Sequence, residues 1–143
     1  MRKIYKACIG ITIFILFYSL WVVVLLYTDP LMRSESSIRR YLLRSTPIGT
    51  SMSDVIFDAI LHPEWSVQLI DRSYGVVLFP SSSVPTRMPG RWASPENIVG
   101  YMSVEAHLGT RRMIVRFDVT AFYAFDSDGK LIEILVRKEF DVI

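Results

Sequence analysis

Residues 111–138 read RRMIVRFDVTAFYAFDSDGKLIEILVRK, and this stretch determines the fold that we expect for the C-terminal half of the chain. From Arg111 to Phe125 apolar and polar side chains alternate, which is typical of a β-strand with one buried face. A second apolar run from Lys130 to Lys138 provides its partner. The inward positions of the first strand are Met113, Val115, Phe117, Val119, Ala121, Tyr123 and Phe125.

The segment between these runs, Asp126-Ser127-Asp128-Gly129-Lys130, predicts a tight hairpin. Both central residues of a type I′ turn need a positive φ angle, and Asp-Gly satisfies this requirement. A calcium loop is the alternative, because Asp-x-Asp-Gly occurs in EF-hands. Aligning Gly129 with the invariant sixth position of that loop places Ala124 and Leu135 where carboxylates are required, so no metal site is expected.

The preceding sequence predicts further strands and two short helices. Residues 98–108 alternate in the same way, and residues 65–70 and 76–79 are separated by a loop of hairpin length. Ser34–Arg44 carries apolar residues at helical spacing, and Ser51 with Asp54 forms the N-terminal signature of a second helix that His62-Pro63 ends. We therefore expect an α+β domain over residues 34–143, with two short helices on a four- to five-stranded antiparallel meander sheet.

The N-terminal segment predicts a transmembrane helix. Residues 7–28 contain no charged side chain, and a helix of this length spans roughly 33 Å, close to the thickness of the hydrocarbon core. No small-x-small cleavage site follows the apolar run, so a retained signal-anchor over residues 1–28 is favoured over a cleaved signal. Arg2, Lys3 and Lys6 predict a cytoplasmic N-terminus, with the domain outside the inner (cytoplasmic) membrane beyond a linker of residues 29–33.

Composition argues against several classes of function. The chain has 143 residues and a net charge of +2, but its first 28 residues carry +3 and the remainder carries −1, which argues against nucleic-acid binding. The single cysteine, Cys8, lies in the predicted anchor, and the two histidines are His62 and His107. Neither metal-ligand spacing nor a nucleophile motif is present, so we expect no cofactor, no metal and no enzyme activity. Glu105 and His107 share one strand face, but exposed strand residues explain them better than acid–base catalysis.

Two groups of residues are candidates for binding. The irregular segment 81–97 is longer than most loops and contains Arg87, Arg91 and Trp92, residue types that often anchor protein interfaces. A partner contact centred on Trp92 competes with the alternative that this side chain covers the sheet. Arg33, Arg39 and Arg40 follow the anchor closely and could contact anionic headgroups, although a solvated helix face explains them as well.

Two stretches resemble a known group of proteins. Residues 41–51, YLLRSTPIGTS, followed by Val55 and Ile56, resemble the start of the domain in small single-pass membrane-anchored bacterial proteins of unknown function, as does the ending at residues 125–138. More distantly, this order of helices and hairpin looks like the SmpA/OmlA and β-lactamase-inhibitor-like group, whose small domains generally bind other proteins. The chain departs from that group because a membrane helix replaces the lipidated cysteine, and His62-Pro63-Glu64-Trp65 replaces a glycine-rich turn.

These observations predict a membrane-anchored, non-catalytic binding domain of the cell envelope that contacts the lipid bilayer and another envelope protein. One alternative is an accessory or structural membrane subunit that interacts through its transmembrane helix. An enzyme of unknown type is the third reading, and the absence of paired catalytic groups places it last.

Overall fold

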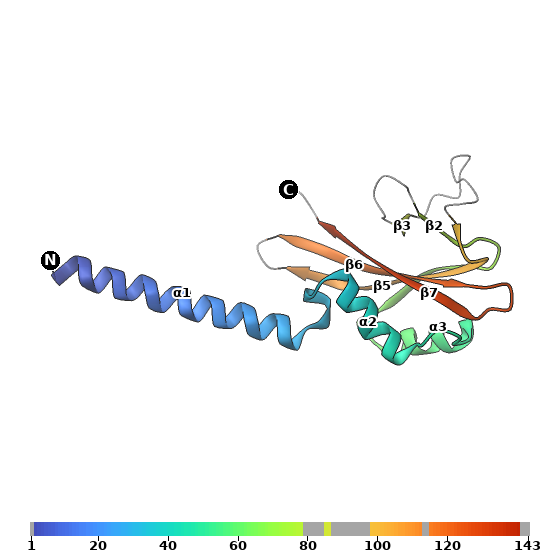
Figure 1. The fold of residues 1–143 in the computed structure, drawn as a ribbon, viewed down its shortest axis with the longest axis horizontal. Coiled ribbons are helices and arrows are strands. Elements are labelled where there is room, and N and C mark those ends of the chain that lie inside the picture. The colour runs from blue at the N-terminus through green and yellow to red at the C-terminus, as the bar shows by residue number, and fades with distance from the viewer. Residues whose placement is uncertain (1, 79–84, 87–97, 113–114, 141–143) are drawn as a thin grey trace.

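The computed structural model describes residues 2–78, 85–86, 98–112 and 115–140, and within the first helix it describes the side chains of residues 10–24 and 28. Three α-helices and one short 3-10 helix precede all of the described strands (Figure 1). The elements are α1 (Arg2–Thr28), η1 (Pro30–Met32), α2 (Glu35–Ser45), α3 (Met52–Leu61), β1 (Ser66–Asp71), β2 (Val76–Leu78), β3 (Pro85–Thr86), β4 (Ile98–Val99), β5 (Met102–Arg112), β6 (Arg116–Phe125) and β7 (Leu131–Phe140).

The predicted α+β class is confirmed. The main sheet has the strand order β1-β5-β6-β7 with antiparallel neighbours, and α2 and α3 cover one of its faces (Figure 1). The core lies between the helices and this face of the sheet. Its helical side is formed by Leu31, Ile38, Leu42, Val55 and Ala59, and its sheet side includes Val104, Ala106, Leu108, Phe117, Val119, Ala121, Tyr123, Phe125, Leu131, Ile134 and Val136.

The hairpin expected at Asp128-Gly129 is confirmed. β6 pairs with β7 across this turn, and Gly129 has the positive φ of 73° that the turn requires. The expected strand from Arg111 to Phe125 is divided, however, because β5 continues to Arg112 and β6 begins at Arg116. Arg112 and Arg116 pair in this second hairpin. The alternation of apolar and polar residues continues through this turn in the sequence, so the pattern did not predict it. Met113, which was expected to point inward, lies outside the described residues.

The expected hairpin between residues 65–70 and 76–79 is wrong. β1 pairs with β5, whereas β2 pairs with β3 and β4 in a separate small sheet of order β3-β2-β4. Val76 of this small sheet packs on Phe122 and Ala124, which point away from the helices. The end of β6 is therefore buried on both faces, and the domain has three layers at that end. β3 also lies within the segment 81–97 that was expected to be one irregular loop.

α1 is joined to the domain by side chains of the segment expected to be a linker. Asp29 accepts the N–H of Leu31 at 2.9 Å and pairs with Arg111 at the end of β5. Leu31 is only 3% exposed and belongs to the core. Lys138 Nζ also donates to the carbonyl of Arg33. These contacts place the start of the domain directly after Thr28.

Along the part of α1 whose side chains are described, apolar residues such as Ile11, Phe14 and Phe17 are exposed. Among the described residues, the structure contains no helix whose length and apolar character would suffice to cross a membrane.

Candidate functional site

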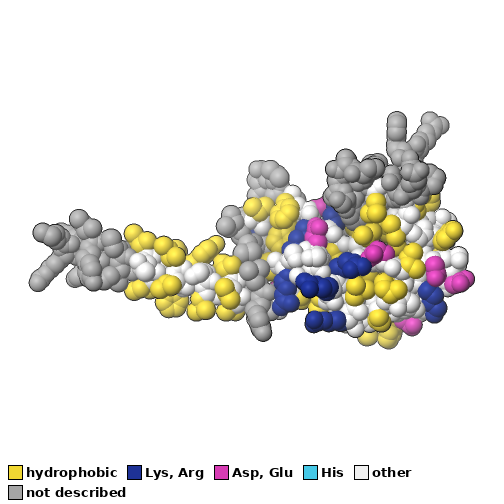
Figure 2. All heavy atoms as spheres, viewed as in Figure 1, with side chains coloured by type: hydrophobic (Ala, Val, Ile, Leu, Met, Phe, Trp, Pro, Cys, Tyr) yellow, Lys and Arg dark blue, Asp and Glu magenta, His cyan; other side chains and the backbone are white. Residues whose placement is uncertain are grey.

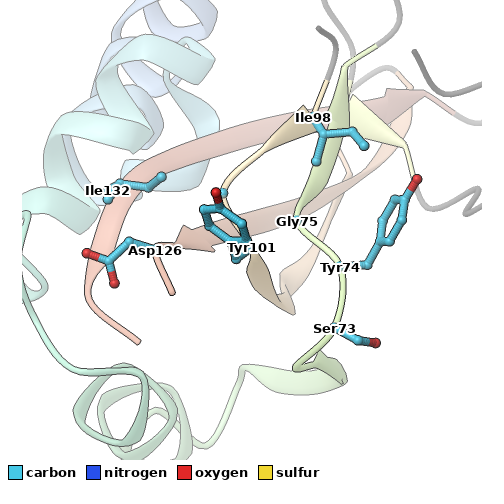
Figure 3. A pocket seen from close by; sticks show the side chains of 8 residues that line it. Ser73, Tyr74, Gly75, Ile98, Tyr101, Asp126 and Ile132 are labelled. Atoms are coloured by element: carbon cyan, nitrogen blue, oxygen red, sulfur yellow. The ribbon is translucent and has the colours of Figure 1, made fainter. Parts of the chain in front are cut away.

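The end of the main sheet farthest from α1 contains an open cavity of about 470 Å³ (Figure 3). β5 extends over roughly 33 Å from Met102 to Arg112, and α1 is attached near Arg111 while the cavity begins beside the other end. The attachment of α1 and the cavity thus lie at opposite ends of β5. The lining residues are Ser73, Tyr74, Gly75, Ile98, Gly100, Tyr101, Asp126 and Ile132.

Two glycines allow the chain segments around this cavity to approach closely. Gly100 has a φ angle of +80°, and a Cβ atom at that position would lie 2.5 Å from the carbonyl oxygen of Phe125. A Cβ atom on Gly75 would lie 2.2 Å from the carbonyl oxygen of Gly100. The N–H of Tyr101 donates to the carbonyl of Phe125 at 2.7 Å. The walls of the cavity are therefore held by backbone contacts that no larger residue permits.

Polar side chains around the cavity stabilise the adjoining turns. Asp126 Oδ1 accepts the N–H groups of Asp128 at 2.9 Å and Lys130 at 2.8 Å. In the β1–β2 connection, Asp71 accepts the N–H and the hydroxyl of Ser73, which lower the pKa of the carboxyl group. These carboxylates support loops and do not converge on a reacting atom. The exposed groups are mainly apolar and aromatic, since Tyr101 is 69% exposed and Ile132 is 40% exposed.

The residues expected to bind a partner in the long segment cannot be placed, because Arg87, Arg91 and Trp92 lie outside the described residues. The described elements on either side of them still locate the base of the segment. β2 ends at Leu78 and pairs with β4, whose first residue Ile98 lines the cavity. The expected contact of Trp92 stays a prediction. Sequence reasoning missed Tyr74 and Tyr101, because a single tyrosine in a loop or at a strand end has no periodic signal.

The arginines expected to contact headgroups are separated by the structure. Arg33 and Arg40 line a groove of about 200 Å³ on the outer side of α2, together with Ser37, Tyr41 and Arg44. Arg39 turns to the other side of the helix, where its Nη2 lies 2.6 Å from Oε1 of Glu133 on β7. Four of these residues, Ser37, Arg40, Tyr41 and Arg44, follow at spacings of three, one and three residues, which is the signal of one helical stripe, whereas Arg33 precedes α2 and has extended backbone.

The histidines have structural contacts in the described part of the chain. The ring of His62 stacks on Trp65 with a centroid distance of 4.0 Å, and its Nδ1 lies 3.0 Å from the carbonyl oxygen of Asp58. His107 pairs with Thr120 across β5 and β6, and Glu105 pairs with Phe122. Within the described residues, no group of three or more histidine, cysteine, aspartate or glutamate residues is arranged to hold a metal ion.

No family model, curated protein or solved structure matched this chain. The resemblance to the SmpA/OmlA and β-lactamase-inhibitor-like group therefore stays an expectation from two short motifs.

Proposed function

We propose that this chain is a membrane-anchored, non-catalytic binding domain of the cell envelope, and that it contacts another envelope protein at the end of its sheet. The observation that carries this proposal is the separation between the attachment of α1 and the aromatic cavity along β5. A domain built in this way would present its cavity roughly 33 Å from the point at which the anchor ends.

The anchor is proposed from the sequence. Residues 7–28 are uncharged, and they lie in a continuous helix from Arg2 to Thr28. Phe14 is 70% exposed and Phe17 is 69% exposed. Burial of such side chains in lipid would remove their apolar surface from water, and the favourable free energy of this transfer is about 25 cal/mol per Å². We place the N-terminus in the cytoplasm and the domain outside the inner membrane, as the basic N-terminal residues favour.

Binding to a protein is supported by the chemistry of the cavity. Tyrosine and isoleucine side chains supply apolar area, and tyrosine is enriched among the residues that dominate interface energies. The carboxylates nearby are engaged in turns, and the described lining of the cavity contains no acid–base pair. The base of the segment with Arg87, Arg91 and Trp92 adjoins the same cavity through Ile98.

Site-specific photo-crosslinking in intact cells tests the partner contact. A crosslinkable residue at Tyr101 is expected to give one discrete adduct, while the same residue at Phe57, which is 63% exposed on α3, gives none. Replacing Ile132 by Asp in the Tyr101 crosslinker variant should abolish the adduct and leave thermal stability unchanged. Equal adducts from Tyr101 and Phe57, or no adduct from Tyr101, would reject the contact.

The anchor and its orientation need a separate test. The full-length protein should stay with membranes during alkaline extraction, and alkaline phosphatase fused after Ile143 should be active. Release from membranes, or an active cytoplasmic reporter at the same position, would reject this topology. If exchanging residues 1–28 for an unrelated membrane helix removes the Tyr101 adduct, the accessory-subunit alternative gains support, because interaction then depends on the helix itself.

A further inference from the structure

The groove on the outer side of α2 has an unusual concentration of positive charge. Arg33, Arg40 and Arg44 surround it, and Ser37 and Tyr41 complete its described lining, which contains no carboxylate. Figure 2 shows Lys and Arg side chains gathered over the part of the domain nearest α1. Three guanidinium groups around one hollow create a positive local potential, which attracts an anion.

The acidic residues of this part of the chain are directed elsewhere. Asp29 and Glu35 are the acidic residues of segment 29–45, and Asp29 pairs with Arg111 on β5. Glu35 Oε1 accepts the backbone N–H of Lys138 at 2.9 Å on β7. Glu133, which lies beside α2, binds Arg39 on the sheet side of the helix. Asp29, Glu35 and Glu133 thus bind groups of the sheet or face it, and none of them belongs to the described lining of the groove.

The groove has the size and donor chemistry of a phosphate site. A volume of about 200 Å³ corresponds to roughly seven water molecules, which accommodates a phosphate group with part of its ester. Guanidinium groups bind phosphate oxygens in a bidentate geometry that lysine cannot reproduce. The hydroxyl groups of Ser37 and Tyr41 provide neutral donors for further oxygens, and Arg40 already lies 3.2 Å from Ser37 Oγ.

We infer that this groove, which we call the arginine groove, binds the phosphate of an anionic phospholipid headgroup. The inference rests on the proposed membrane anchor, because the first arginine of the groove, Arg33, follows the last residue of α1 by only five positions. The burial of Leu31 and the ion pair between Asp29 and Arg111 fix the groove beside the point where α1 ends. Bound lipid would set the rotation of the domain on the membrane and thereby the direction in which the distal cavity faces.

Titration of the full-length protein in neutral detergent micelles tests the groove without depending on membrane insertion. The added ligands are short-chain phosphatidylglycerol, short-chain phosphatidylcholine and inorganic phosphate, and the readout is the NMR signal of the arginine Nε–H groups. We expect phosphatidylglycerol to shift the Arg40 and Arg44 signals at lower concentration than phosphatidylcholine, since choline carries a positive charge. Inorganic phosphate should bind more weakly than phosphatidylglycerol. Tighter binding of inorganic phosphate would assign the groove to a soluble phosphate and overturn the lipid.

Substitutions separate a built site from general charge attraction. Arg40→Ala with Arg44→Ala should weaken phosphatidylglycerol binding about tenfold or more, because two charge-assisted contacts are lost. Arg40→Lys with Arg44→Lys keeps the charge and should still weaken binding, by about threefold, because the planar guanidinium is lost. This second pair also keeps the test valid if the alanine pair fails to fold.

The matched control is Arg72→Ala with Lys130→Ala, which removes two exposed cations outside the groove. This control should bind phosphatidylglycerol within about twofold of the unmodified protein. Equal losses in the control and in the alanine pair, or full binding by the alanine pair, would overturn the inference. Release of the protein by alkaline extraction would instead reject the anchor, whatever the titration shows.

Discussion

Arg39 of α2 and Glu133 of β7 form an ion pair in which Nη2 and Nε of the guanidinium lie 2.6 Å and 2.9 Å from the same carboxylate oxygen. Arg39 Nε also donates to the carbonyl of Ile134 at 2.9 Å, and the N–H of Ile134 donates to Glu133 at 2.8 Å. Both backbone groups of an edge-strand residue are thereby satisfied by side chains. α2 thus protects the β7 edge, where unpaired backbone groups would otherwise invite pairing with another chain.

We predict that Arg39→Ala lowers the free energy of unfolding by about 1 kcal/mol, a modest loss because the pair is about one-third exposed. Urea unfolding of the full-length protein, followed by tryptophan fluorescence, measures this change. Arg40→Ala is the matched control, since this neighbour faces the arginine groove, and it should change stability by less than about 0.5 kcal/mol. Equal losses from both substitutions would mean that the contact between Arg39 and Glu133 does not stabilise the edge.

The sequence predicted those elements whose signals are local. The N-cap of α3 appears as expected, because the Ser51 hydroxyl oxygen accepts the N–H of Asp54. The turn at Gly129 and the buried alternation of β6 were also predictable, since turn chemistry and a period of two act within a few residues. The expected class of fold followed from these elements.

Local signals could not predict that β1 and β2 belong to different sheets. This arrangement depends on the close approach of Gly75 to the carbonyl of Gly100, which are 25 positions apart in the sequence. The arginine groove was found in part, because Arg33 and Arg40 were expected at the surface, whereas the direction of Arg39 depends on Glu133 of a distant strand. Tyr101 was missed because a single tyrosine at a strand end has no periodic signal.

Leu31 connects the anchor to the core, and its truncation tests that connection. Because this side chain is 3% exposed, we predict that Leu31→Ala lowers the free energy of unfolding by about 2–5 kcal/mol, through lost burial and the cavity that remains. Leu61→Ala is the control, since Leu61 is 62% exposed, and it should cost less than about 0.5 kcal/mol. Urea unfolding compares the two variants, and a small effect of Leu31→Ala would show that residues 29–33 behave as a loose linker.

The pKa of Asp71 provides a prediction on acid stability. Donation from the N–H and the hydroxyl of Ser73 lowers this pKa in the folded protein, so the folded state binds fewer protons than the unfolded state as pH falls. The stabilisation is present above the unfolded pKa of about 3.9 and is lost as pH falls through the folded value. Ser73→Ala removes the hydroxyl and retains the N–H, so the pKa should rise part of the way.

NMR titration of the Asp71 carboxyl carbon measures this shift directly. Ser45→Ala is a suitable control, because the hydroxyl of Ser45 donates to the carbonyl of Leu42 in α2 and not to a carboxylate. The control should leave the titration of Asp71 unchanged and leave acid unfolding as in the unmodified protein. If Ser73→Ala also leaves the Asp71 titration unchanged, donation from the hydroxyl is not a cause of the lowered pKa.

A comparison of two glycines tests how the distal cavity is held. Gly49 and Gly100 both have positive φ angles, +91° and +80°. An added Cβ atom would meet nothing within 4 Å at Gly49, whereas at Gly100 it would lie 2.5 Å from the carbonyl oxygen of Phe125.

Gly49→Ala introduces backbone strain alone, which costs about 1 kcal/mol. Gly100→Ala adds a steric clash with the backbone and should destabilise the domain by at least about 2 kcal/mol more, since moving residue 100 away from Phe125 would stretch the hydrogen bond from the Tyr101 N–H to the Phe125 carbonyl. Thermal unfolding monitored by circular dichroism gives the order of the two melting temperatures. A melting temperature for Gly100→Ala equal to that for Gly49→Ala would show that the crossing at the cavity tolerates a side chain, and the cavity wall would then be adaptable instead of fixed by its backbone.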